Sequence, residues 1–192
     1  MSKHNEIFED PASKRTRHDT AIDPTADIGW NPLLIRDNTA MVAPDFNCSA
    51  LLKGGEINRF QLSSYAANHK ALVLFFIGSN LIDPRVQMDL DLISNHLDRL
   101  EALQTLPLAM STAPIESMQD TCNVGYPLLS DITRSVSRYF NVLDAANGSA
   151  KRAAFILDSR RRIRYSFMLG DDRINHSINT IITLLQSVVM AG

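Results

Sequence analysis

Cysteine is scarce in this sequence. The chain of 192 residues contains two cysteines, Cys48 and Cys122. Two thiols are too few for the disulfide framework that holds small secreted domains together. We therefore expect a reducing compartment, the cytoplasm, and two cysteines that pack as small hydrophobic residues. The alternative interpretation is that Cys48 and Cys122 are redox-active thiols.

A strong net charge and a long apolar run are also absent. The formal net charge is −2, so no sequence-wide field attracts nucleic acid or an anionic membrane. The apolar run at residues 71–77 is far shorter than the roughly 20 residues of a membrane-spanning helix. The N-terminus is too polar for a signal peptide. We therefore expect neither nucleic acid nor a membrane as a partner.

Metal-ligand spacing and the residue order of a hydrolytic triad are absent as well. No paired carboxylates stand out, and the histidines are scattered without ligand spacing. We therefore expect no metal ion and no cofactor. The basic cluster at residues 160–164 is predicted to be a charged hairpin turn, because no aromatic platform for nucleic acid accompanies it. The five histidines are His4, His18, His69, His96 and His176.

Residues 1–40 form a distinct segment, which we interpret as a largely irregular N-terminal arm. Three prolines in this segment, Pro11, Pro24 and Pro32, disfavour helix at the residues before them. An apolar cluster at residues 30–35 is predicted to dock on the body of the protein or on a partner subunit. The folded domain is predicted to span residues 41–192. The cluster contains Trp30, Leu33, Leu34 and Ile35.

From residue 41 onward, short apolar runs alternate with helical segments, which is typical of an α/β fold. The run at residues 71–77 is apolar throughout and predicts a central strand that is covered on both faces. Apolar residues at spacings of three and four predict a helix over residues 84–104. Asp83 is its expected N-cap and Pro84 its first residue. Further strands are expected at 106–111, 126–129, 153–157 and 163–167, and helices at 114–120, 133–140 and 171–189.

Several strings over residues 41–189 resemble the peroxiredoxin family in their order and spacing. The resemblance implies a thioredoxin-like fold in its peroxiredoxin elaboration, with a central mixed sheet flanked by helices. It also implies an antioxidant role in redox homeostasis. The strings are VAPDF at 42–46, GGEI at 54–57, FQLSSY at 60–65, LVLFF at 72–76, YPLLSD at 126–131 and RAAFILD at 152–158.

The same resemblance locates a site that has lost its nucleophile. In the family, a loop of the form Pro-x-x-x-Thr-x-x-Cys places a thiolate at a helix N-terminus, where the positive helix end and an arginine favour it. In this sequence Asp83 stands where the cysteine would stand, and Asn80 where the threonine would orient the peroxide. The loop also lacks the family's proline. Arg152 matches the arginine that pairs with the thiolate and the peroxide.

Asp83 has two interpretations. The first is structural: its carboxylate caps the helix and forms an ion pair with Arg152. The second is that Asp83 imitates the charge of an over-oxidised cysteine, the sulfinate, and so fixes one conformation or one assembly state.

The resemblance implies a peroxiredoxin-like protein without peroxidase activity, because peroxide reduction needs a polarisable nucleophile that a carboxylate does not supply. We expect it to act through binding or assembly. The expected assembly is a homo-oligomer, either a dimer or a ring, or a hetero-oligomer with an active paralogue. The alternative is an active thiol peroxidase that uses Cys48 or Cys122 together with a thioredoxin-type reductant.

Overall fold

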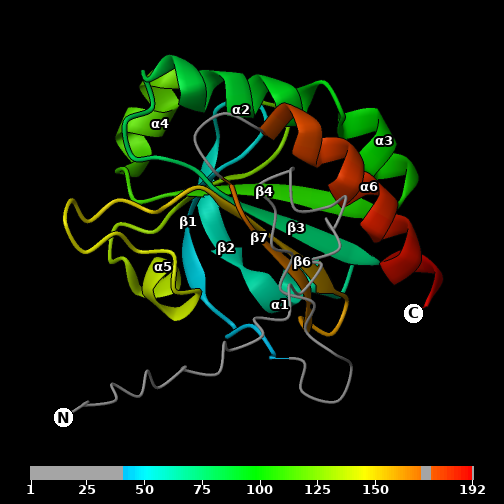
Figure 1. The fold of residues 1–192 in the computed structure, drawn as a ribbon. Coiled ribbons are helices and arrows are strands. Elements are labelled where there is room, and N and C mark those ends of the chain that lie inside the picture. The colour runs from blue at the N-terminus through cyan, green and yellow to red at the C-terminus, as the bar shows by residue number, and fades with distance from the viewer. Residues whose placement is uncertain (1–40, 170–173, 192) are drawn as a thin grey trace, which may run out of the picture.

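The computed structural model describes residues 41–169 and 174–191, which form seven strands and six helices (Figure 1). The strands are β1 (Asn47–Leu51), β2 (Ile57–Gln61), β3 (Ala71–Phe76), β4 (Thr105–Ser111), β5 (Leu128–Ser130), β6 (Ala153–Asp158) and β7 (Ile163–Met168). The helices are α1 (Leu62–Ala66), α2 (Pro84–Ser94), α3 (Leu97–Ala102), α4 (Ile115–Thr121), α5 (Ser135–Tyr139) and α6 (Ile174–Met190).

The proposed N-terminal arm, residues 1–40, lies outside the described residues, and so does its apolar cluster. The division of the chain at residue 40 therefore stays a prediction. No helix within the described ranges is long and apolar enough to span a bilayer.

One mixed sheet contains all seven strands, in the order β2-β1-β5-β4-β3-β6-β7. Strand β3 lies between β4, to which it is parallel, and β6, to which it is antiparallel. All six of its residues are buried. This confirms the prediction of a central strand, which followed from an apolar run without alternation.

Helices cover both faces of the sheet (Figure 1). Helices α2, α3, α4 and α6 contribute buried side chains to one hydrophobic core, and α1 and α5 contribute to a second core on the opposite face. Alternate residues of β3 serve the two cores: Val73 and Phe75 pack in the first, Leu72 and Leu74 in the second. The predicted architecture, a mixed sheet between helical layers, is confirmed.

The single helix predicted over residues 84–104 is wrong, because the chain forms α2 and α3 with a break at Asn95 and His96. Side chains compete for the carbonyls of the last turn of α2. The Ser94 hydroxyl donates to the Leu90 carbonyl at 2.9 Å, and a His96 ring nitrogen bonds the Leu92 carbonyl at 2.8 Å. These bonds, with the modest helix propensity of asparagine and histidine, end the helix.

Tyr126, which lies just before β5, connects α2 to the sheet through a hydrogen bond. Its side chain is 2% exposed, and its hydroxyl donates to the Leu90 carbonyl at 3.0 Å. We predict that Tyr126→Phe lowers the free energy of unfolding by about 1 kcal/mol in a urea titration. The control is Tyr139→Phe, which removes a hydroxyl that donates to Val42 at the surface, and we expect a loss below about 0.5 kcal/mol. Equal losses would contradict this account of Tyr126.

Candidate functional site

The loop at residues 77–83 connects β3 to α2 and is tied to two neighbouring segments. The Ser111 hydroxyl, at the end of β4, donates to the Gly78 carbonyl at 3.0 Å. The Ser79 amide donates to the Ser149 hydroxyl at 3.1 Å, which lies in the loop before β6. These bonds fix the point at which α2 begins.

Asp83 is the N-cap of α2, with Pro84 at the first helical position, as predicted. Its carboxylate accepts the Arg85 amide at 2.9 Å and pairs with the Arg85 guanidinium at 3.1 Å. Hydrogen bonds from the side chain and the backbone of Arg85 lower the pKa of Asp83, and the charge of Arg152 adds to this at longer range. Asp83 is therefore a carboxylate at neutral pH, already engaged by its own helix.

Asn80 contributes its backbone to this loop. Its carbonyl accepts the Asp83 amide at 3.1 Å, which closes the turn before the helix. Its side chain is exposed and forms no hydrogen bond within the described part of the chain. Asn80 and Asp83 thus share one turn, and the assignment of Asn80 to the threonine position stays a prediction.

Arg152 reaches the same site from the neighbouring strand. It precedes β6, and the pairing of Phe76 with Ala153 places it at the end of β3, where the loop begins. Its guanidinium donates two hydrogen bonds to Asp89 on α2, Nε to Oδ2 at 2.7 Å and Nη2 to Oδ1 at 2.6 Å. Both oxygens of the Asp89 carboxylate are therefore bound by one arginine.

The predicted ion pair between Asp83 and Arg152 is wrong, because Asp83 pairs with Arg85 and Arg152 pairs with Asp89. The reason is the position of each carboxylate on α2. Asp83 lies at the solvent-facing start of the helix, whereas Asp89 lies about one and a half turns later on its buried face and is 2% exposed. A buried carboxylate without a cation is strongly destabilising.

The protonation of Asp89 reflects two opposing effects. Burial raises the pKa of Asp89, and the hydrogen bonds and charge of Arg152 oppose that rise. The side chain of Arg152 is itself only 14% exposed, so both charges have been withdrawn from water. At this depth each charge depends on the other for its stabilisation.

Sequence reasoning missed Asp89 and Arg85. A signal for Asp89 is present, because it lies three residues after Val86 and four before Ile93, both buried residues of α2. An acidic residue on the apolar stripe of an amphipathic helix needs a buried cation. Arg85 carries no comparable signal, because an exposed arginine in the first turn of a helix is unremarkable.

The two cysteines lie outside this site, and they are free thiols. Cys48 lies in β1, where burial, followed by the charge of Asp131, raises its pKa to about 12. Cys122 is the C-cap of α4, and burial raises its pKa as well. Neither thiol lies at a helix N-terminus that would favour the thiolate.

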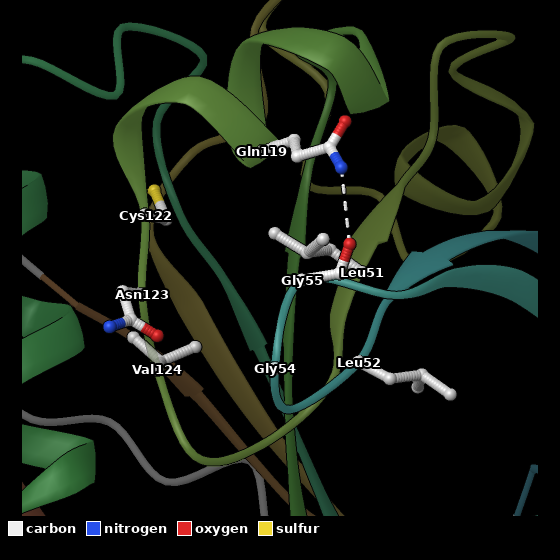
Figure 2. Close-up of a pocket in the computed structure, with 8 residues that line it drawn as sticks. All are labelled: Leu51, Leu52, Gly54, Gly55, Gln119, Cys122, Asn123 and Val124. Carbon is white, nitrogen blue, oxygen red and sulfur yellow. Dashed lines mark hydrogen bonds between the residues drawn. The ribbon is translucent and has the colours of Figure 1, made fainter.

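A pocket of about 360 Å³ lies beside Cys122, between the β1–β2 turn and the end of α4 (Figure 2). The Gln119 side chain reaches across it and donates to the Gly55 carbonyl at 3.1 Å. No charged side chain is among the described residues that line it. A protonated thiol in such surroundings has no group to activate it.

The side chains of His69 and His96 bond to the backbone. A ring nitrogen of His69 bonds the Tyr65 carbonyl, and one of His96 bonds the Leu92 carbonyl, both at 2.8 Å. Over residues 41–169 and 174–191, no group of three or more histidine, cysteine, aspartate or glutamate side chains could hold a metal ion. His4 and His18 lie outside the described residues.

A family model matches residues 40–166, and its description is the AhpC/TSA family. The 2-Cys peroxiredoxin BAS1 of Spinacia oleracea is 28% identical over 162 residues, covering 78% of this chain and 59% of the spinach protein. Peroxiredoxin-2 of Cricetulus griseus is 26% identical over 155 residues, covering 76% of each chain. The chain thus spans well under two thirds of the spinach protein and about three quarters of the hamster protein.

Solved structures show the same fold. The mitochondrial 2-Cys peroxiredoxin from Plasmodium falciparum has a TM-score of 0.69 at 23% identity, covering 79% of this chain and 94% of that chain. AhpC from Enterococcus faecalis has a TM-score of 0.69 at 24% identity, covering 79% of this chain and 93% of that chain. The predicted peroxiredoxin elaboration of the thioredoxin-like fold is confirmed.

We predict that Asp89→Ala lowers the free energy of unfolding by about 3–5 kcal/mol, because it leaves the Arg152 guanidinium buried without its carboxylate. The double variant Asp89→Leu/Arg152→Met should recover most of this loss, because it removes both charges. Urea titration of the unmodified chain, Asp89→Leu, Arg152→Met and the double variant completes a cycle that measures the coupling.

The matched control is Arg85→Ala, which breaks the exposed pair with Asp83 and should cause a much smaller loss. Similar losses of unfolding free energy for Asp89→Ala and Arg85→Ala would contradict the assigned role of the buried pair. So would a double variant that is as unstable as Asp89→Ala.

Proposed function

The chain belongs to the AhpC/TSA family, and from that premise we propose that it is a peroxiredoxin homologue without peroxidase activity, which acts through binding or assembly in redox homeostasis. One observation carries the proposal: Asp83, and no cysteine, caps the helix that follows β3. A carboxylate cannot form the sulfenic acid through which a thiol reduces peroxide.

The arginine supports the same proposal. An arginine that assists peroxide reduction has to present its donors to the thiolate and to the peroxide oxygens. Here the Nε and Nη2 atoms of Arg152 donate to the buried carboxylate of Asp89, at 2.7 and 2.6 Å. A peroxide would have to compete with a charged, bidentate and desolvated partner for those donors.

The alternative function is an active thiol peroxidase that uses Cys48 or Cys122 with a thioredoxin-type reductant. The relative from Fasciola hepatica that bears the name thioredoxin peroxidase motivates this alternative. Against it stands the state of the thiols. With a pKa of about 12 for Cys48, only about one thiol in ten thousand is ionised at pH 8, and the thiolate is the species that attacks peroxide.

We propose the cytoplasm as the compartment, because both cysteines are free thiols in this fold and reducing compartments keep thiols in that state. We propose self-assembly into a dimer or a ring, or assembly with an active paralogue, as the way in which a fold without its nucleophile still acts. If Asp83 imitates a sulfinate, its negative charge fixes one conformation or one assembly state, whether the chain assembles with itself or with a paralogue.

Stopped-flow consumption of hydrogen peroxide by the reduced protein decides between the two functions. We predict a second-order rate constant no higher than that of free cysteine, because both thiol pKa values are raised. Cys48→Ser and Cys122→Ser should give the same rate as the unmodified chain. Rapid turnover that is lost in one of these variants would establish the alternative function and identify its cysteine.

Analytical ultracentrifugation of the full chain tests assembly. We predict a dimer or a larger species at micromolar concentration, and a monomer at every concentration would contradict self-assembly. Asp83→Asn keeps the shape of the side chain and removes its charge. An unchanged sedimentation coefficient in that variant would leave Asp83 as a helix cap and would refute the sulfinate interpretation.

A further inference from the structure

A second pocket lies at the opposite end of β3 from the candidate site. It has a volume of about 620 Å³ and lies where β3 begins, beside the β6–β7 turn and the end of α6. Its lining brings together side chains that are far apart in the sequence. The polar and charged lining residues are Asn68, His69, Lys70, Gln104, Asp158, Ser159, Arg160, Arg162 and Arg164.

The charge of this pocket is strongly positive. Four of the lining residues are Lys70, Arg160, Arg162 and Arg164, and the lining contains one carboxylate, Asp158. Arg164 forms an ion pair with Asp158 at 3.5 Å. No ion pair joins Lys70, Arg160 or Arg162 to any acidic side chain in the described part of the chain. The chain as a whole carries a net charge of −2, so the sign of the charge in this pocket is opposite to that of the whole chain.

Asp158 fixes the turn that presents these arginines. Its Oδ1 accepts the backbone amides of Arg160 and Arg162, both at 2.9 Å. Arg161, between them, has a φ of 62°, and its guanidinium donates to the Ala43 carbonyl, away from the pocket lining. The carboxylate is therefore largely used to shape the backbone, and the two flanking arginines line the same pocket from a rigid turn.

His69 adds a polar group to the lining. Its Nδ1 lies 2.8 Å from the Tyr65 carbonyl, and because a carbonyl only accepts, Nδ1 carries the proton. This contact does not involve Nε2, the second polar atom of the ring. Val188 and Val189 of α6 form an apolar part of the lining.

From these observations we propose that this pocket binds a compact organic ligand through a chain of two or three phosphate groups. Several cationic side chains on one rigid turn, with Lys70 from a second segment, match an anion of multiple charge. The volume is typical of a small-molecule site. The valines of α6 provide a place for an uncharged part of the ligand.

A nucleic acid fits this pocket less well than a compact ligand. No phenylalanine, tyrosine or tryptophan is among the described lining residues, so bases have no stacking platform. Ala191, the residue after α6, is part of the lining, and the negative end of this helix opposes any phosphate on its side of the pocket, so a nucleic-acid backbone that crosses the whole pocket is disfavoured. These features confine the favourable charge to the side of the hairpin.

Isothermal titration calorimetry at constant ionic strength tests the proposal with two probes, inorganic tripolyphosphate and ATP. We predict micromolar binding of at least one probe. Equal affinities would mean that the phosphate chain alone is recognised, and tighter binding of ATP would mean that the nucleoside adds contacts; both results support the proposal. If neither tripolyphosphate nor ATP binds at millimolar concentration, the proposal is overturned.

The variant Lys70→Ala/Arg162→Ala should weaken binding about tenfold or more, since it removes one cation from each of the two segments that supply them. The control Lys53→Ala/Arg138→Ala removes one lysine and one arginine from exposed positions outside the lining and should change the affinity less than twofold. Equal effects of the two double variants would overturn the proposal. Arg160→Gln, which keeps the turn, provides a second and milder test with the same expected direction.

The third probe is a short single-stranded RNA with the same number of phosphates as tripolyphosphate. If it binds more tightly than tripolyphosphate at the same ionic strength, the site recognises a polymer and the proposal of a compact ligand is overturned. This experiment does not depend on peroxide chemistry, because the pocket and the Asp83 loop lie at opposite ends of β3.

Discussion

The buried ion pair between Arg152 and Asp89 is the interaction on which the candidate site depends. It joins the segment before β6 to the middle of α2, across the end of β3. The bidentate contact with Arg152 offsets the cost of burying the Asp89 carboxylate. The pair therefore fixes where α2 lies relative to the sheet, and with it the position of Asp83 at the helix start.

The same pair accounts for the stability of a peroxiredoxin fold that has Asp83 at the start of α2. An arginine that has lost an anionic partner would be a buried, uncompensated cation. In this chain Asp89 supplies the anion from within the helix, and Asp83 satisfies the helix start through Arg85. The buried carboxylate of Asp89 and the helix cap of Asp83 thus both come from the chain itself, and neither contact requires a thiolate or a bound peroxide.

The sequence predicts the features that follow from local patterns. The uninterrupted apolar run of β3, the Asp83-Pro84 helix start and the arginine-rich β6–β7 hairpin are all present as predicted. The partner of Arg152 could not be predicted from spacing, since it depends on the strand register and on which face of α2 is buried. The break between α2 and α3 depends on bonds to individual carbonyls in the last turn of α2, which no periodicity contains.

The central claim is that Asp89 engages the Nε and Nη2 donors of Arg152, so that a ligand at the start of α2 would have to compete for them. The rate of hydrogen peroxide reduction by the variant Asp83→Cys tests this claim most directly. The claim predicts a rate close to that of free cysteine, because the new thiol would have a helix N-terminus beside it but would compete with Asp89 for the Nε and Nη2 donors of Arg152. Rapid peroxide reduction by this single variant would contradict the claim, since it would mean that Arg152 still serves the site.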